Sequence, residues 1–445
     1  MPEPREEIAK LLSQLIQVDT TNPPGNETAA AQLLKDWLAD RGVRSTIIES
    51  AKGRGNLVAT IGEEEPSILL LSHLDVVPAN PEEWKVHPFS GEVRNGFVWG
   101  RGAIDCKGLV AIEAFLTAEL ASREDWEGRI VFAATADEEM GGKMGVGWLV
   151  ENRPELLKAD FGINEGGGLE IPGKRGSVFT VQVAEKGVYW LEITFKGEPG
   201  HASMPLIGNN ALLKASKFIQ DLAKRKPGVT VTEAAKKFIE EIADVMGLGP
   251  LASLLLNRFT ADIALTAIKD RRTAALIDSI LRNTLTPTIL RSGDKENIIP
   301  SNATLVVDSR LLPGFDETWL REYLEKLLPS GAEVNFIHSD PPSESPIDTL
   351  LFESIKRSIS DMVSGARVTP FLVPGGTDSR YIRWKYGYPI YGFQPIRADL
   401  PVGEILAMIH GVNERISVKN LVFGYETLRR TLEIFFKKET KHKTT

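Results

Sequence analysis

The first third of the chain alternates stretches that have helical spacing of apolar residues with short aliphatic runs. Helical spacing predicts helices, and the unbroken aliphatic runs between them predict strands that are apolar on both faces. Strands of this kind, separated by helices, indicate a sheet that is covered by helices on both sides, which is an α/β fold. The expected helices cover 6–18, 27–41 and 109–122, and the expected strands are N-L-V-A-T-I (56–61), S-I-L-L-L-S (67–72) and R-I-V-F-A-A-T-A (129–136).

From about residue 186 the pattern predicts a second, smaller domain. Its elements follow the order strand, helix, strand, strand, helix, strand, which is that of a ferredoxin-like domain. The mostly helical residues 226–283 interrupt this order after the first helix, and we interpret them as an insertion. The expected strands are V-Y-W-L-E-I-T-F (188–195), T-L-T-P-T-I-L (284–290), A-T-L-V-V-D-S-R-L (303–311) and A-E-V-N-F-I-H (332–338), and the expected helices cover 209–224 and 319–328.

The α/β pattern resumes after the Pro/Ser-rich linker P-P-S-E-S-P (341–346). We therefore predict one discontinuous α/β domain, residues 1–185 and 341–445, with a mixed and mostly parallel sheet. A domain of residues 186–340 interrupts it. The elements expected after the linker are a helix from 350, strands R-V-T-P-F-L-V (367–373) and Y-P-I-Y-G-F (388–393), and a last helix from 418 that runs into a basic tail.

Composition and charge narrow the class of protein. The 445 residues are 42% hydrophobic and 25% charged, as is usual for globular proteins, and the net charge of −8 argues against partners such as nucleic acid or an anionic membrane. The single cysteine, Cys106, excludes an internal disulfide, and no apolar run approaches the length of about 18 residues that suggests a membrane span. The first residues do not resemble a signal peptide, so we expect a cytoplasmic protein.

Acidic residues and a histidine follow the expected strands at their carboxyl ends, where α/β sheets bind ligands. His73 and Asp75 end the run I-L-L-L-S-H-L-D-V-V-P, Glu138 and Glu139 lie in T-A-D-E-E-M-G-G, and Glu165 ends D-F-G-I-N-E. For an isolated H-x-D pattern, a core histidine capped by its neighbouring aspartate is the commoner interpretation. Adjacent buried acids, however, repel one another unless a cation offsets their charge.

Two further candidates complete a set of metal ligands. Asp105 lies in the glycine-rich G-R-G-A-I-D-C-K-G, where it could also be a simple helix cap, and His410 lies in A-M-I-H-G-V-N-E, outside any periodic pattern. Nitrogen and oxygen ligands without cysteine suit Zn²⁺, Mn²⁺ or Co²⁺, and two metal ions about 3.5 to 4 Å apart share a bridging carboxylate.

A symmetric division places a bridging Asp105 between two ions. His73 and Glu165 complete one ion's ligands, and Glu139 and His410 complete the other's. Asp75 then accepts the second ring N–H of His73, and Glu138 is left as the general base for a metal-bound water.

In their order along the chain, these motifs resemble those of the di-zinc M20 peptidase family, which includes acetylornithine deacetylase, succinyl-diaminopimelate desuccinylase, aminoacylase-1 and glutamate carboxypeptidase. The resemblance runs from about residue 5 to about 435 and also rests on G-E-P-G-H-A-S-M-P and G-G-T-D-S-R. It implies two Zn²⁺ ions, replaceable by Co²⁺ or Mn²⁺, the same ligand set, and a lid domain that commonly forms a homodimer. It also implies a cis peptide bond between Asp105 and Cys106.

Substrate-binding candidates come from the second domain and from the loop after residue 373. The resemblance implies that His201 binds the oxyanion, often from the partner subunit. Arg310, with Asn297 nearby in sequence, is placed to bind a substrate carboxylate, although a salt bridge to Asp308 on the same strand face is an equal alternative. Gly375, Gly376 and Thr377 offer backbone donors. We treat His87 and His338 as structural.

We therefore expect a metal-dependent hydrolase that cleaves the amide bond of N-acyl amino acids, or releases the carboxy-terminal residue of short peptides. The segments E-K-G-V-Y-W and S-G-D-K-E-N-I-I-P are most similar to the branch of carboxypeptidase S and N-acyl-amino-acid hydrolases. A dipeptidase, a desuccinylase and a deacetylase of the same family are the alternatives, as is a non-catalytic binding protein. A serine hydrolase is disfavoured because no G-x-S-x-G elbow occurs.

Overall fold

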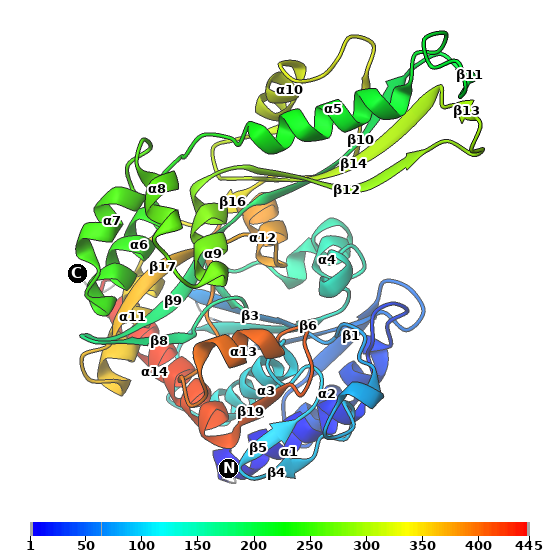
Figure 1. The fold of residues 1–445 in the computed structure, drawn as a ribbon. Helices are drawn as coiled ribbons and strands as arrows, with labels where there is room; N and C mark the ends of the chain where they lie inside the picture. The colour runs from blue at the N-terminus through cyan, green and yellow to red at the C-terminus, as the bar shows by residue number, and fades with distance from the viewer. Residues whose placement is uncertain (1–2, 64, 443–445) are drawn as a thin grey trace.

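The computed structural model of the protein describes residues 3–63 and 65–442, and a ten-stranded sheet forms its centre (Figure 1). The main path of this sheet is β1-β2-β6-β3-β7-β18-β9-β16, and β8 and β17 also pair with β9. The sheet is mixed and mainly parallel, as the pattern predicts, because β3 pairs in parallel with both β6 and β7. The strands are β1 Ser45–Glu49, β2 Gly55–Ile61, β3 Ser67–His73, β6 Arg129–Thr135, β7 Phe161–Asn164, β8 Glu170–Gly173, β9 Gly176–Glu185, β16 Ser343–Glu344, β17 Arg367–Val373 and β18 Ile390–Gly392.

Both faces of the central sheet are buried, because alternate residues of β3 enter two different hydrophobic cores. Ile68 and Leu70 join the larger core, whereas Leu69 and Leu71 join a smaller one on the opposite face. The helices of the larger core include α1 Pro4–Gln17, α2 Glu27–Ala39, α3 Lys107–Ala121, α11 Leu350–Met362, α13 Val402–Met408 and α14 Val418–His442, and those of the smaller core are α4 Val146–Asn152 and α12 Ser379–Tyr386.

A second sheet of four antiparallel strands, in the order β12-β14-β10-β15, has a hydrophobic core of its own. Helices α5 and α10 pack on one of its faces, and the other face looks toward α4 and α12 (Figure 1). The chain order is the predicted ferredoxin-like one: β10 Gly187–Lys196, α5 Ala211–Lys224, β12 Thr284–Ser292, β14 Asn302–Leu311, α10 Glu317–Glu325 and β15 Glu333–Asp340. The division into domains at residues 186 and 341 stays a prediction.

The helices between α5 and β12 pack on the central sheet, although the sequence places them within the smaller domain. Phe238 of α6 contacts Phe371 of β17, with 5.1 Å between ring centroids, and most of the buried residues of α6 to α9 belong to the larger core. The apolar face of α6 therefore covers β9 and β17, and α7 and α9 pack against α6. The four helices are α6 Glu233–Met246, α7 Gly249–Leu255, α8 Ala261–Thr266 and α9 Arg271–Leu281.

Two small sheets and three short helices complete the described chain. One of these sheets, β11 Gly200–His201 with β13 Ile298–Ile299, lies at the end of the second sheet that is far from the central sheet (Figure 1). The other contains β4 Val93–Arg94, β5 Phe97–Trp99 and β19 Arg415–Ser417, and the short helices are η1 Pro81–Glu83, η2 Glu138–Met140 and η3 Pro154–Leu156. Within residues 3–63 and 65–442, no helix combines the length and the apolar character needed to cross a lipid bilayer.

Candidate metal centre

The parallel strands β3, β6 and β7 are neighbours, so their carboxyl ends bring the candidate acids to one edge of the central sheet. His73 is the last residue of β3 and is buried. Glu138 and Glu139 lie in η2, just after β6, and Glu165 directly follows β7. This common edge is the feature of the fold that assembles the site.

Asp105 lies between two histidines from distant parts of the chain. Its Oδ1 is 3.1 Å from Nε2 of His73, and its Oδ2 is 3.1 Å from Nε2 of His410. The same nitrogen of His410 is 3.0 Å from Oε2 of Glu139. One carboxylate therefore faces two imidazoles with its two oxygens, which is the arrangement that a bridging ligand requires.

A buried carboxylate outside the predicted set holds the loop of Asp105 in place. Glu414 accepts the backbone N–H groups of Gly102, Ile104 and Asp105 at 2.7 to 3.0 Å, and it pairs with Arg101 at 2.8 Å. Sequence reasoning missed this role, although Glu414 ends the A-M-I-H-G-V-N-E segment chosen for His410. The peptide bond between Asp105 and Cys106 is cis, as the family resemblance implies.

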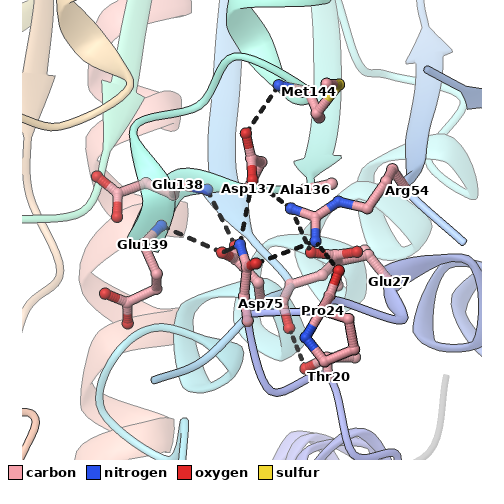
Figure 2. Close-up of polar contacts among 12 residues, drawn as sticks. Thr20, Pro24, Glu27, Arg54, Asp75, Ala136, Asp137, Glu138, Glu139 and Met144 are labelled. Carbon is pink, nitrogen blue, oxygen red and sulfur yellow. Dashed lines mark hydrogen bonds and ion pairs between the residues drawn. The ribbon is translucent and has the colours of Figure 1, made fainter. Parts of the chain in front are cut away.

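Asp75 contacts both His73 and the turn that carries Glu138. Nδ1 of His73 lies 3.0 Å from the backbone oxygen of Asp75 and 3.5 Å from its carboxylate, and the predicted role of that carboxylate as acceptor of the ring N–H stays a prediction. The carboxylate also accepts the backbone N–H groups of Glu138 and Glu139, both at 3.1 Å (Figure 2). Asp75 thereby links the end of β3 to the turn after β6.

The acids at this edge carry more negative charge than the surrounding protein compensates. Desolvation raises the pKa of Glu138 well above its ordinary value, and it raises that of Glu165 to about 8, with the charge of Asp105 adding to the second shift. Hydrogen bonds with Asp105 and Glu139 raise the pKa of His410 to about 10. These shifts show that the cluster favours additional positive charge.

The donor atoms fit a divalent metal. Among the described residues, His73, Asp105 and Glu139 each offer one ligand atom, and these atoms lie within 4.8 Å of one another. The second oxygen of Glu139, Oε1, is buried without a hydrogen-bond partner, which is unusual for a carboxylate. A cation coordinated by these groups would satisfy that oxygen and reduce the repulsion between the acids.

Two predicted substrate-binding groups already have partners within the chain. Arg310 donates to both carboxylate oxygens of Asp308, at 2.6 and 2.9 Å, which is the alternative that the sequence left open. The backbone N–H and the hydroxyl of Thr377 both bond to Glu185 at 2.8 Å, so the N–H of Thr377 is not a free donor. Gly375 and Gly376 are partly exposed, and open space surrounds Gly375.

His201 lies away from the metal ligands, on the small sheet at the far end of the second sheet, and Asn297 directly precedes strand β13 of that small sheet (Figure 1). The backbone oxygen of Asn297 accepts the N–H of Ala202, and the exposed ring of His201 contacts the Ser203 hydroxyl at 2.7 Å. The fold of one chain therefore does not bring these two residues to His73.

The other two histidines have local partners. Nδ1 of His87 accepts the backbone N–H of Phe89 at 3.2 Å. His338 pairs with Asp340 at 3.0 Å and lies against Trp190, with 4.9 Å between ring centroids.

Histidine and carboxylate side chains that could hold a metal ion, gathered at the carboxyl edge of an α/β sheet, are typical of a metal-dependent hydrolase. The chain belongs to peptidase family M20/M25/M40, whose sequence profile matches residues 69–434. The resemblance found in the sequence motifs is thus confirmed.

The relatives of the chain include proteins from several branches of this family. It is 31% identical over 358 residues to the N-fatty-acyl-amino acid synthase/hydrolase PM20D1 of Xenopus tropicalis, covering 78% of this chain and 68% of that protein. It is 26% identical over 382 residues to a probable succinyl-diaminopimelate desuccinylase of Staphylococcus aureus, covering 84% of this chain and 87% of that one.

Solved structures share the fold over nearly the whole chain. An M20 family metallo-carboxypeptidase of Sulfolobus solfataricus superposes with a TM-score of 0.71 at 19% identity, covering 96% of this chain and 98% of that chain. A dinuclear metal-binding peptidase of the M20 family from Bacillus subtilis superposes with a TM-score of 0.62 at 13% identity, covering 98% and 99%.

Proposed function

We propose that the protein hydrolyses the amide bond of N-acyl amino acids, or releases the carboxy-terminal residue of short peptides, with two zinc ions that Co²⁺ or Mn²⁺ can replace. The observation that carries this proposal is the placement of Asp105, whose two carboxylate oxygens face His73 and His410. In the proposed ligand set, Glu165 accompanies His73, and Glu139 accompanies His410.

In this proposal a bound metal pair supplies a water of lowered pKa and a Lewis acid for the substrate carbonyl. Glu138 accepts the proton of the attacking water on its carboxylate and later donates it to the leaving amine nitrogen. Burial raises the pKa of Glu138 above its ordinary value, which makes its carboxylate a stronger proton acceptor. Asp75 keeps the turn of Glu138 attached to β3.

Two features support an N-acyl amino acid as the substrate. One is the similarity to N-fatty-acyl-amino acid synthase/hydrolases and, at 25% identity, to a probable carboxypeptidase S-like protein of Dictyostelium discoideum. The other is Arg310, which can bind the carboxylate of the amino acid if that carboxylate replaces Asp308. A desuccinylase or a dipeptidase is the second candidate, because a probable desuccinylase and a carnosine dipeptidase are also similar to the chain.

A substrate panel tests this choice. Protein loaded with Zn²⁺, Co²⁺ or Mn²⁺ should release free amino acid from acetyl, succinyl and long-chain acyl amino acids, and methylation of the amino acid carboxylate should raise KM because Arg310 loses its ligand. The Arg310→Lys variant should reduce this difference between acid and ester, since lysine lacks the two-pronged geometry. Hydrolysis confined to the succinyl substrate, or to dipeptides with a free amino terminus, would select the second candidate.

We further propose a homodimer that forms through the second sheet and brings His201 of one chain to the metal centre of the other. Its support is the surface around His201, where Met204, Leu206 and Ile207 are 52%, 100% and 66% exposed. Ile298, on the strand that pairs with His201, is 49% exposed. An apolar tip of this kind suits burial against a second copy, and His201 would then donate a hydrogen bond to the oxyanion of the tetrahedral intermediate.

Mixing two inactive variants tests the shared site. His201→Ala and Glu138→Gln each remove one component of the site, so each homodimer should be nearly inactive. If His201 acts across the dimer, a heterodimer has one centre with both residues intact, and co-expression should restore up to about a quarter of wild-type activity from random pairing of the subunits. A mixture that remains as inactive as the single variants would contradict a shared site.

A further inference from the structure

The turn that carries Glu138 and Glu139 begins at a residue with an unusual backbone conformation. Asp137 has a φ of 73°, in the left-handed region that residues with a side chain seldom adopt. Its side chain is anchored on both oxygens. Oδ2 accepts the backbone N–H of Met144 at 2.8 Å, and Oδ1 accepts hydrogen bonds from Arg54 and from Asn22, the latter at 3.2 Å. These contacts hold the turn in its conformation.

Arg54, directly before β2, is the buried cation in this cluster, with 6% of its surface exposed. Besides Asp137, it pairs with Glu27 at 3.2 Å and donates to the backbone oxygen of Pro24 at 2.7 Å. The chain wraps closely around it at Gly25, where a Cβ atom would lie 1.6 Å from a guanidinium nitrogen. Only glycine therefore fits at position 25 while Arg54 keeps this place.

Arg54 is also connected to the candidate metal centre through Asn22. It donates to the side-chain oxygen of Asn22 at 3.1 Å, and the amide nitrogen of Asn22 donates to Asp75 at 2.8 Å. Asp75 in turn accepts the backbone N–H groups of Glu138 and Glu139. Asp137 and Asp75 thus both hold the turn, and Arg54 bonds to Asp137 directly and to Asp75 through Asn22.

The side chains of Glu138 and Glu139, which would carry the chemistry, point away from Arg54. In Figure 2 the carboxyl groups of Glu138 and Glu139 extend from the turn on the side opposite to Arg54. Arg54 therefore contacts neither of them, and any influence on them passes through Asp137 and Asp75.

The charges around Arg54 explain why a neutral residue would not replace it. Asp137 and Glu27 both face its guanidinium group, and Glu27 is fully buried. Burial raises the pKa of Glu27 to about 7, and the charge of Asp75 adds to this shift. Without Arg54, the carboxylate of Asp137 would be buried beside other acids with no cation near it, which strongly destabilises its position.

We propose that Arg54 is a positioning residue for the hydrolysis: by holding Asp137 and Asn22, it directs Glu138 toward the attacking water and Glu139 toward the metal pair. This inference rests on the proposed roles of Glu138 and Glu139. It assigns a function to an arginine that the sequence motifs do not mark and that lies outside the ligand set.

Substitution of Arg54 tests the proposal in two independent measurements. Arg54→Met should lower kcat about 10- to 100-fold with little change in KM, and it should weaken Zn²⁺ binding to the metal-free protein by a similar factor in a calorimetric titration. Arg54→Lys keeps the positive charge but lacks the planar guanidinium group, so its kcat and Zn²⁺ affinity should lie between those of the wild type and of Arg54→Met. The matched control is Arg41→Met, which removes a 2.6 Å ion pair with Glu7 from the end of α2 and should leave both quantities unchanged.

A double variant tests whether Arg54 acts through Asp137. Asparagine tolerates the left-handed conformation and can still accept the N–H of Met144, but it carries no charge. Arg54→Met combined with Asp137→Asn should therefore bind Zn²⁺ more tightly than Arg54→Met alone. The proposal would be overturned if the factors by which Arg54→Met and Asp137→Asn each weaken Zn²⁺ binding simply multiplied in the double variant. A folded Arg54→Met protein with wild-type kcat and Zn²⁺ affinity would also overturn it.

The two measurements separate this inference from the proposed activity. If the wild-type protein hydrolyses none of the substrates, the Zn²⁺ titration still reports on Arg54, so the two ideas fail independently. If Arg54→Met shows no thermal unfolding transition, Arg54→Lys takes its place, and wild-type Zn²⁺ affinity in Arg54→Lys would refute the positioning role.

Discussion

Replacing Glu138 with glutamine is expected to lower kcat by about 100- to 10,000-fold, because glutamine has nearly the same shape but can neither accept the proton of the attacking water nor return it to the leaving amine. The metal content should remain that of the wild type, since Glu138 is the acid that the proposed ligand set leaves uncoordinated. The turn should also persist, because it is the backbone N–H of Glu138 that bonds to Asp75. Steady-state kinetics together with elemental analysis of the purified variant measure both effects.

The neighbouring acid provides the matched control. Glu139→Gln makes the same chemical change one residue further along, but Glu139 contacts His410 at 3.0 Å and belongs to the proposed ligands. It should therefore lose metal as well as activity. A Glu138→Gln protein that is fully loaded and retains half of the wild-type kcat would remove Glu138 from the mechanism.

Asp105→Asn is expected to have the second large effect. An amide has one oxygen and one NH₂ group, so asparagine cannot offer two anionic oxygens to two metal ions. The variant should bind fewer than two metal ions per chain, and its kcat/KM should fall at least about 1,000-fold, since bound metal supplies several kcal/mol of transition-state stabilisation. Elemental analysis after dialysis against Zn²⁺ and the hydrolysis assay test the two parts.

An exposed aspartate controls for the change of charge. Asp125→Asn removes a carboxylate that pairs with Arg123 at the surface, and it should leave metal content and activity unchanged. Two tightly bound metal ions in Asp105→Asn would contradict the bridging role, even if the activity were low.

The sequence pattern predicted most elements of the fold because their burial is regular. Every residue of β3 is buried, as its unbroken aliphatic run suggests, and the alternation of β10 matches the single covered face of the second sheet. The pattern missed β9, the strand that pairs with β8, β16, β17 and β18. Its polar residues Thr180 and Gln182 are buried, so its composition does not resemble that of a central strand.

Helices α6 to α9 show the limit of local patterns in another way. Their apolar periodicity identifies amphipathic helices, but it does not specify the surface that each helix covers. In the structure α6 covers the central sheet, with Phe238 against Phe371, and α7 and α9 pack on α6, although all four helices interrupt the chain of the smaller sheet.

The sequence likewise predicted one part of the candidate site and not the other. Residue type and position at strand ends were enough to select His73, Asp105, Glu139 and His410, which the fold brings together. The role of Asp75 toward the ring of His73 stays a prediction, because Nδ1 of His73 lies near both the backbone oxygen of Asp75, at 3.0 Å, and its carboxylate, at 3.5 Å.

By itself, the sequence determined the α/β class, the strand ends that carry the acids, the family and the chemical type of the ligands, because these depend on local periodicity and on motifs of consecutive residues. Only the tertiary structure decided that Glu414 holds the loop of Asp105, that Asp308 pairs with Arg310, and that Arg54 and Asn22 connect to the turn of Glu138. The contacts of Glu414, Arg54 and Asn22 join residues on separate segments of the chain, whereas Asp308 and Arg310 both lie on β14. The burial that favours pairing between charged groups exists only once the chain has folded.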